Sequence, residues 1–514
     1  MVFLQEGGPR SGASSDYVSS SLRATTRLAQ PYTTPPVIFC NLQRLQYSKE
    51  ERPFVLPNIL CGHEVILPMS QMRWLLEQPD HILNQHEVNK QALCADRTML
   101  DHNIIGEAHL RDFIRRSLTR DLDTHAGAIV EEIEDGLEAF WGSDTENWRE
   151  VTLYDGMLGI IGQLVNRVFV GLPLCRDPEF LHTTMSFAHL VVLTAGFINL
   201  LPSWLKPIFG PVVTAYDKFQ YRKIARVIEP IVRKRALSLG PGVALQKQDF
   251  SQPNDYIQWA LREAYTHSDV RDRSPEMITK RLAVLGFAAI HSSAISITNV
   301  LFDIAASGSS LSIQHELRLE AKRTAEKASN SAWNKASLAG MVMTDSILRE
   351  SMRLWGIISH GVTKSVIAKE GVTLPSGEHL PYGTKCGITS YGPHHDQTVY
   401  DNPYTFDPFR FCRDKLSGAT DSSSKSANAT PTAFVTTTDY YMGFSHGRNA
   451  CPGRFFASQQ LKLLLAHVML KYEIEPIPSR PENQWLNNAI GPPVKEKIRI
   501  RRRKDDVSYV TVGR

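Results

Sequence analysis

The sequence predicts a mainly α-helical fold with a minor β portion, and three observations support this prediction. Helical hydrophobic patterns dominate the chain up to about Trp355, after which β-branched runs alternate with PSG and PYG turns. The 514 residues are 42% hydrophobic and 21% charged, which is ordinary for a globular protein with a large core. No internal repeat and no clear linker divides residues 46–514, so we expect one domain there.

The N-terminal part differs in composition from the rest of the chain. Residues 1–36 are rich in Ser, Thr, Arg and Pro, and we expect residues 1–45 to form a disordered leader. No apolar run there approaches the roughly 18–20 residues that a helix needs to span a bilayer, so no membrane anchor is predicted.

Cysteine content is more informative than net charge about the class of protein. The net charge of +4 is small for this length and by itself argues neither for nor against nucleic acid, and no nucleic-acid partner is expected. The seven cysteines are scattered and odd in number, and none forms a CxxC pair. This argues against a disulfide framework and against a structural zinc site.

Two short runs, RPFVLPNIL and HEVILPMS, predict strands at the start of the domain, and a helical region begins within DHNIIGEAHLRDFIRRSLTRDL. The apolar stretch Ser186–Val213 is interrupted by His189, Asn199, Pro202 and Pro207. We therefore expect two helices with a proline-marked turn rather than one membrane span. Such a segment can line a ligand entrance or dip into a membrane interface, and burial in the core is an equal alternative.

The segment from Ser274 to Ala306 is predicted to form a long central helix. Ser274 suits the N-cap, Pro275 suits the first helical position, and Glu276 favours the positive end of the helix dipole. From Leu282 onward the helix is apolar on nearly every face, which is typical of a helix in the middle of a large protein.

The C-terminal part is predicted to contain short antiparallel strands within HGVTKSVIAKEGVTLPSGEHLPYGTKCGI and a surface loop at SGATDSSSKSANATPT. A helix is expected from Ser458 to Lys471, followed by strands in YEIEPIP and VKEKIRIRRR. The basic run at the end resembles a nuclear signal, but it alternates with Ile498 and Ile500. We therefore expect a charged edge strand.

One cysteine stands apart from the others. In FSHGRNACPG, Cys451 directly precedes Pro452 and a helical run, so its sulfur is expected at a helix N-terminus, where free N–H groups and positive charge lower a thiol pKa. Gly447 and Gly453 permit a tight loop, Gly453 leaves room for a flat partner, and Phe444 can pack against one. These features are typical of a haem iron that is held by a cysteine thiolate.

This loop resembles the haem-ligand signature of the cytochrome P450 superfamily, Phe-x-x-Gly-x-x-x-Cys-x-Gly, with Phe444, Gly447, Cys451 and Gly453 in register. The resemblance implies a large helical domain and a small β-sheet subdomain, with haem b between a long central helix and the cysteine loop. It also implies that Cys451 is the axial ligand of the haem iron.

Two positions of the loop depart from the family pattern. Ser445 stands where the family usually has glycine, and Asn449 stands where a basic residue usually bonds a haem propionate. An asparagine can donate a hydrogen bond but carries no charge, so this anchor is expected to be weaker. Arg448 and His446 are the candidates to compensate, and Lys364 is a further candidate to bind a propionate.

The family's second signature, Glu-x-x-Arg, occurs four times, at Glu146/Arg149, Glu320/Arg323, Glu350/Arg353 and Glu496/Arg499. Only the copy in LRESMRLWG lies in a helix just before the predicted strands and upstream of the cysteine. FDPFRF, with Arg410, resembles the family's Pro-x-Arg-Phe. The resemblance implies that Glu350, Arg353 and Arg410 form a buried network that serves the fold and haem assembly.

A third match lies in the central helix, where FAAIHSSA stands in place of the family's Ala-Gly-x-acid-Thr. The resemblance implies that Ser292 hydrogen-bonds dioxygen or water and that His291 relays protons. A structural role is the alternative for both, because a helical serine often bonds its own backbone. The sequence is similar to the fungal group around ent-kaurene oxidase in three places. These are the histidine in the central-helix motif, the segment HGVTKSVIAKEGVTLPSGEHLPYGTK and the closing IRIRRRK.

The resemblance covers residues 46–503 and implies a haem-thiolate monooxygenase that acts on an apolar small molecule, a terpenoid or related secondary metabolite. Electrons would come from NADPH through NADPH-cytochrome P450 reductase. The candidate docking surface for the reductase is basic and comprises Arg111, Arg115, Arg116, Arg120, Arg448, Arg454 and Lys462. The alternatives are a haem-thiolate isomerase or dehydratase, and a non-catalytic haem or ligand carrier.

Family resemblance also implies association with the endoplasmic reticulum membrane. Because no membrane span is predicted in this chain, the segment Ser186–Val213 is the candidate for contact with the membrane surface.

Overall fold

The computed structural model describes residues 51–57, 62–101, 103–120, 122–238, 253–266, 270–327, 333–416, 432–486 and 488–504. The predicted leader, residues 1–45, lies outside the described residues, as do residues 417–431 of the predicted surface loop at 417–432.

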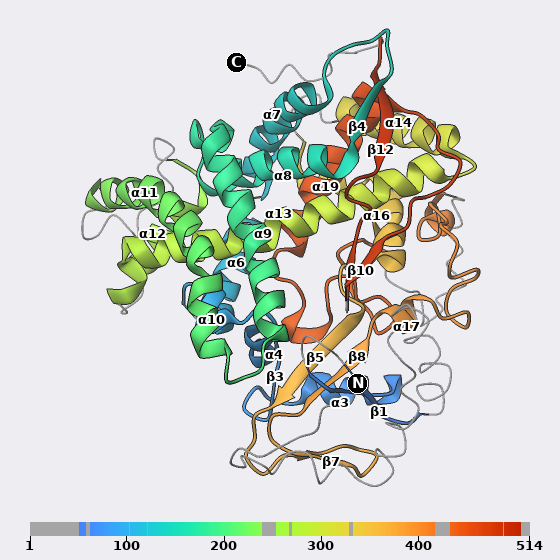
Figure 1. Cartoon of the computed structure of the whole chain (residues 1–514). Coiled ribbons are helices and arrows are strands. Elements are labelled where there is room, and N and C mark those ends of the chain that lie inside the picture. Colours follow the sequence, from blue (N-terminus) through green and yellow to red (C-terminus); the bar gives the residue numbers. More distant parts are fainter. Residues whose placement is uncertain are drawn as a thin grey trace, which may run out of the picture.

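The fold is mainly helical with small sheets, as the sequence predicts (Figure 1). The described helices are α3 (Met72–Glu77), α4 (Gln85–Ala92), α5 (Ala95–Thr98), α6 (Ala108–Arg120), α7 (Leu122–Trp141), α8 (Leu153–Phe169), α9 (Pro178–Leu200), α10 (Lys206–Val213), α11 (Ala215–Ser238), α12 (Tyr256–Thr266), α13 (Pro275–Ala306), α14 (Ser310–Lys327), α15 (Lys335–Ala339), α16 (Val342–Leu354), α17 (Tyr391–His394), α18 (Arg413–Leu416) and α19 (Arg454–Lys471).

Helix α13 crosses the middle of the molecule and packs against α8, α9, α11 and α16 (Figure 1). Its apolar sequence therefore forms the centre of the main core, as predicted. Pro275 lies in the first turn, and Glu276 there pairs with Lys280 at 2.6 Å. Ser274 occupies the N-cap position, as predicted, although its side chain makes no capping hydrogen bond.

The apolar stretch Ser186–Val213 forms two helices, α9 and α10, with Pro202 in the turn between them, as predicted. One face of α9 is buried in the core through residues such as Phe187 and Ile198. The other face continues onto α10 and exposes large apolar side chains to solvent. Burial in the core is therefore confirmed for one face, whereas contact of the other face with a membrane interface or its role in a ligand entrance stays a prediction.

Among the residues that the structure describes, the strands form four small sheets. Their bounds are β1 (Phe54–Leu56), β2 (Glu64–Ile66), β3 (Leu83–Asn84), β4 (Arg149–Thr152), β5 (His360–Val366), β6 (Val372–Thr373), β7 (His379–Leu380), β8 (Lys385–Thr389), β9 (Tyr472–Ile474), β10 (Gln484–Leu486), β11 (Ala489–Gly491) and β12 (Lys497–Arg502). The largest has the order β1-β2-β8-β5-β3, and its strands are antiparallel except for the β2–β8 pair.

Strand β12 corrects one prediction. It is the middle strand of the sheet β4-β12-β9 and not an edge strand. Ile498 and Ile500 are buried, while Arg499 and Arg501 form ion pairs with glutamates of the β9 region, at 2.9 and 2.7 Å. The charged side chains of β12 therefore have partners close to their own sheet. The sequence pattern does not reveal that β4 pairs with β12 on its other side.

Candidate functional site

The cysteine loop is a tight turn held by its own backbone. The Cys451 N–H donates to the Phe444 carbonyl at 2.9 Å, and the Ala450 N–H donates to the Gly447 carbonyl at 3.1 Å. Gly447 has a φ of +73°, and an added Cβ there would lie 2.8 Å from Leu76 Cδ2. The predicted need for glycine at position 447 therefore has a conformational and a steric cause.

Ser445, the first departure from the family pattern, adopts a left-handed conformation with a φ of +59°. A non-glycine residue in this region costs about 1–2 kcal/mol. The Ser445 hydroxyl donates to the Gly361 carbonyl at 2.9 Å, and this bond ties the loop to β5. A hydrogen bond of this kind contributes about 1 kcal/mol, so it offsets much of the strain.

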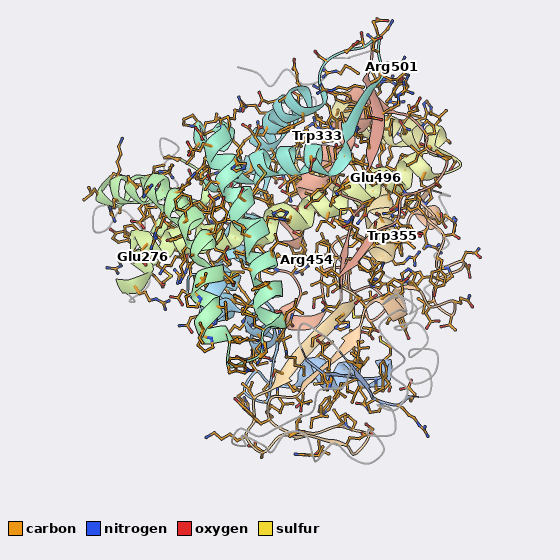
Figure 2. The ribbon with its side chains drawn as sticks, viewed as in Figure 1. Glu276, Trp333, Trp355, Arg454, Glu496 and Arg501 are labelled. Carbon is orange, nitrogen blue, oxygen red and sulfur yellow. The ribbon has the colours of Figure 1, made fainter. Side chains whose placement is uncertain are left out.

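Cys451 lies just ahead of α19, whose N-cap residue is Gly453, and Arg454 at the start of the helix lies near the centre of the molecule (Figure 2). Burial raises the pKa of the Cys451 thiol. This effect is larger than the lowering of the pKa by the N–H groups of Gly453 and Arg454 and by the Arg454 charge. The predicted lowering of the pKa is therefore wrong for the polypeptide alone. A metal ion bound at the sulfur would supply the missing charge.

A cavity of about 490 Å³ separates the cysteine loop from α13. Cys451, Phe444 and Ala457 line it from the loop and α19, while Ala288 and Ser292 line it from α13. A Cβ added to Gly453 would meet nothing within 4 Å, so the space beside the sulfur is open. A soft sulfur donor, small side chains and a largely apolar wall together fit a thiolate-bound haem.

The structure places Ser292 and His291, the two catalytic candidates of α13, at different cavities. Ser292 lines the cavity, and its hydroxyl donates to the Ala288 carbonyl at 2.7 Å. His291 lies on the other face of α13, where it borders a second pocket of about 800 Å³ and its Nδ1 is 3.1 Å from the Tyr154 hydroxyl. Burial lowers the pKa of His291, so its imidazole is neutral near pH 7.

The structure brings Glu350, Arg353 and Arg410 together. Arg353 donates to both oxygens of the Glu350 carboxylate at 2.8 Å, and Nε of Arg410 donates to them at 3.1 Å. The side chains of Glu350 and Arg353 are 0% exposed. Nη1 of Arg353 also donates to the carbonyls of His394 and Pro403, which anchors the irregular segment before the cysteine loop.

His394 links this network to the cavity and was missed by the sequence reasoning. Its Nε2 accepts from the Met442 N–H at 2.8 Å, so its Nδ1 carries the proton and donates to the Arg353 carbonyl at 3.1 Å. Burial, with positive neighbours, holds the pKa of His394 well below its usual value. It also lines the cavity, but it belongs to no motif that could have identified it.

Lys364 and Arg448, two of the three predicted propionate ligands, meet at the same carbonyl. Both donate to the oxygen of Gln78, at 3.2 and 2.6 Å, and Arg448 also pairs with Asp80 at 2.8 Å. Within the described part of the chain, neither side chain lines the cavity. Their binding of a propionate stays a prediction.

Three comparisons place the chain among known proteins. The sequence model of the family described as Cytochrome P450 matches residues 107–498. The chain is 31% identical over 461 residues to cytochrome P450 monooxygenase efuH of Hormonema carpetanum, covering 88% of this chain and 80% of that protein. It is also 31% identical over 470 residues to cytochrome P450 monooxygenase gloP of Glarea lozoyensis, covering 89% and 85%.

A solved structure shows the same fold. The crystal structure of a cytochrome P450 (CYP102L1) superposes with a TM-score of 0.66 at 15% sequence identity. The superposition covers 93% of this chain and 96% of the other.

Proposed function

The chain belongs to the cytochrome P450 family, and we propose that this haem-thiolate monooxygenase oxidises an apolar small molecule, a terpenoid or related secondary metabolite. The observation that carries the proposal is the shared cavity. Cys451 lines it from the loop, and Ala288 and Ser292 line it from the central helix. The cavity therefore has the thiolate ligand on one side and, on the other, a helix face whose small side chains leave room for a substrate.

Haem bound through a cysteine thiolate activates dioxygen, because the thiolate favours O–O cleavage. The chain's own residues would position and protect this chemistry. Cys451 would hold the iron, and Phe444 would pack beside the sulfur. Because the Ser292 proton is directed to the Ala288 carbonyl, its oxygen presents lone pairs to the cavity and would accept a hydrogen bond from water there.

His291 would take part from the other face of α13. Its neutral imidazole contacts the Tyr154 hydroxyl and borders the second pocket, so it is placed to exchange protons with that pocket. Two features support this proposed relay role: the position of the imidazole ring, and the place of His291 at the acid position of the family's Ala-Gly-x-acid-Thr motif.

The proposed substrate class rests on the lining of the cavity and on the relatives. Val88, Ile357, Ile358 and Leu461 give the cavity an apolar wall, which favours a hydrocarbon-rich substrate. The relatives from Hormonema carpetanum and Glarea lozoyensis are cytochrome P450 monooxygenases, and we propose a terpenoid or related secondary metabolite as the substrate of this one. The similarity to the ent-kaurene oxidase group supports the same choice and is itself part of the proposal.

NADPH-cytochrome P450 reductase is the proposed electron donor. Arg115 and Arg116 on α6 are 41% and 67% exposed, and Arg448 of the cysteine loop is 46% exposed, so these three can meet an acidic partner. Lys462 does not belong to this surface, because it is buried and pairs with Asp345 at 2.7 Å. The prediction that includes Lys462 is wrong for that residue.

The exposed face of α9 and α10 is the proposed contact with the endoplasmic reticulum membrane. Large apolar side chains gather there and on the turn between the two helices, with Trp204 of the turn 72% and Val212 of α10 71% exposed. By length and composition α9 and α13 could each cross a membrane, but both pack within the folded domain. A surface contact therefore suits α9 better than a span.

Reconstitution tests the proposed activity. The purified chain is combined with the reductase and a panel of diterpene hydrocarbons, and products are identified by mass spectrometry. We expect products one oxygen atom heavier that require both NADPH and dioxygen. Turnover that persists without either would contradict the proposal and favour the isomerase or dehydratase alternative.

A flotation assay tests the membrane contact. Trp204, Ile208 and Val212 are changed to serine, and binding to neutral phospholipid vesicles is compared with that of the matched exposed change Leu311→Ser. We expect the triple variant to lose vesicle binding and the control to keep it. Equal binding by both would contradict a contact through this face.

A further inference from the structure

A stripe of polar side chains runs along the central helix α13, away from the cavity beside Cys451. Ser292, Ser296, Asn299 and Asp303 recur every three or four residues, so they lie on one face of the helix. Asn299 and Asp303 are each only 2% exposed. Burying polar groups of this kind is costly unless partners satisfy them, so the neighbours of the stripe decide what it does.

A small cavity borders the middle of this stripe. Ser296, Asn299 and Ser351 are among the residues that line it, and Ser296 also lines the cavity beside Cys451. The centre of a water molecule has about 10 Å³ in which to move there, which is about what a single water needs. We call this space the inner cavity.

Two polar atoms at the inner cavity are suited to hold such a water. The side-chain oxygen of Asn299 accepts from Nη2 of Arg480 at 2.8 Å, but Asn299 Nδ2 has no acceptor in the part of the chain that the structure describes. Ser351 Oγ and Asp303 Oδ2 are also buried without a hydrogen bond of normal geometry there, although Ser351 lies close enough to Asp303 to lower the pKa of its carboxyl. A water that binds Asn299 and Ser351 would satisfy both and reach Asp303 through Ser351.

Asp303 stands at the outer end of the stripe, where it lines a surface pocket of about 640 Å³. Trp355, at the C-cap of α16, lines both this pocket and the inner cavity (Figure 2). Tyr404 of the same pocket is 56% exposed, so the pocket opens to solvent.

The carboxyl of Asp303 is held at one oxygen only by strong partners. Its Oδ1 accepts from Nε of Arg480 at 2.5 Å and from the indole of Trp355 at 2.9 Å. Burial raises the pKa of Asp303, and this effect is larger than the lowering by the Arg480 charge. Asp303 therefore holds a proton at a higher pH than an exposed aspartate does, and Oδ2 is the oxygen that can carry it.

We propose that Asp303 and a water in the inner cavity form a proton relay that leads from the surface pocket to the cavity beside Cys451. Monooxygenation consumes two protons and two electrons for each oxygen atom that enters the substrate, and it releases one water. Each proton would pass from Asp303 through Ser351 and the bound water to Ser296. The hydroxyl groups and the water each give up one proton as they accept another, and Asp303 regains its proton from solvent in the surface pocket.

The relay delivers its protons next to the residue that is placed to use them. Ser296 donates to the carbonyl of Ser292 at 2.9 Å, one helical turn away, and both serines line the cavity. Asn299 and Ser351 are then positioning residues, since they hold the water. The relay is separate from His291, which borders the second pocket on the other face of α13. It rests on the haem-thiolate function proposed above.

A high-resolution crystal structure of the haem-loaded protein tests the water directly. We expect one ordered water in the inner cavity, about 2.7–3.2 Å from Asn299 Nδ2 and from Ser351 Oγ. An inner cavity without an ordered water would overturn the relay. This measurement needs no turnover, so it does not depend on the identity of the substrate.

Two ways of driving the reaction separate a relay from a structural role. Asp303→Asn keeps the size of the side chain and an acceptor for Arg480, but it cannot carry the proton. With NADPH and the reductase, and with a diterpene that the wild type oxidises, we expect product per NADPH consumed to fall at least about tenfold. Hydrogen peroxide supplies oxygen, electrons and protons together, so the yield with peroxide should stay close to that of the wild type.

Equal losses in the two assays would mean that Asp303 only supports the fold, and no loss in either would also overturn the relay. The matched control is Asp217→Asn, since Asp217 on α11 is buried and burial raises its pKa too. Asp217 bonds Thr194 and lines none of the three cavities, so we expect neither yield to change.

A second variant covers the case in which Asp303→Asn fails to fold. Asn299→Leu leaves the pair of Asp303 and Arg480 in place but removes the amide that holds the water. We expect the same difference between the NADPH and peroxide assays, and a full yield with NADPH would overturn the relay. A wild type without a thiolate-type spectrum would instead refute the proposed function, so the two failures are distinguishable.

Discussion

The two walls of the cavity hold their polar groups in different ways. Behind the cysteine loop, Glu350 accepts a hydrogen bond from Arg410, which is 60 residues later in the sequence, and Arg353 donates to a carbonyl 50 residues later. On α13, Ser292 bonds a carbonyl only four residues away. Hydrogen bonds between residues far apart in the sequence hold separate segments together, whereas the loss of a bond within one helix leaves that helix intact. Changes behind the loop should therefore cost stability, and changes on α13 should cost activity.

The largest effect is expected for Glu350→Gln, which leaves the buried Arg353 and Arg410 without their carboxylate. Breaking a buried pair in this way costs about 3–5 kcal/mol, so we expect little haem-loaded protein and a much lower thermal midpoint. The matched control is Glu146→Gln, in an exposed Glu-x-x-Arg whose carboxylate side chain is 66% exposed. Equal unfolding of the two variants would show that the network does not hold this wall.

The next effect is a dependence on pH that comes from His394. Because its folded pKa lies well below 6.5, the unfolded chain binds a proton below about pH 6.5 and the folded chain does not. The free energy of unfolding should fall as pH drops, by up to about 1.4 kcal/mol per pH unit for this one site. We expect urea unfolding of His394→Gln between pH 7 and 5 to show a shallower slope than the wild type.

His315→Gln provides the control for this slope, since His315 is exposed on α14. A slope that is unchanged in His394→Gln would mean that other buried histidines, and not the link between the network and the cavity, set the acid sensitivity.

A smaller effect is expected at Ser445. Ser445→Ala keeps the left-handed φ of +59° but loses the bond to Gly361, so we expect a loss of about 1 kcal/mol in chemical unfolding. Ser445→Gly loses the same bond but also relieves the strain, so its stability should lie close to that of the wild type. If the alanine variant were as stable as the glycine variant, the strain would not be present in solution.

The smallest change in stability is expected on α13. Ser292→Ala removes only a local bond, so we expect the unfolding free energy to change by less than about 0.5 kcal/mol. The yield of oxidised product per NADPH consumed should instead fall by at least about tenfold. Full coupling in this variant would contradict a catalytic part for Ser292 and favour the structural alternative.

Local patterns predicted the main helices from α6 onward and most strands, and a short signature predicted the cysteine loop. Cys451 and Glu350 could be found because each belongs to a spaced motif. His394 could not, since its role depends on partners that only the folded chain brings near. The middle position of β12 was missed for the same reason, because its neighbour β4 is a short, unremarkable segment.

The most direct test of the central claim is the spectrum of the reduced, carbon-monoxide-bound protein, recorded beside Cys451→Ser. The account predicts a thiolate-type Soret shift in the wild type and its loss in the variant, because Cys451 is the cysteine that lines the cavity among the described residues. A wild type without this shift, or a variant that retains it, would contradict the assignment of Cys451 as the iron ligand.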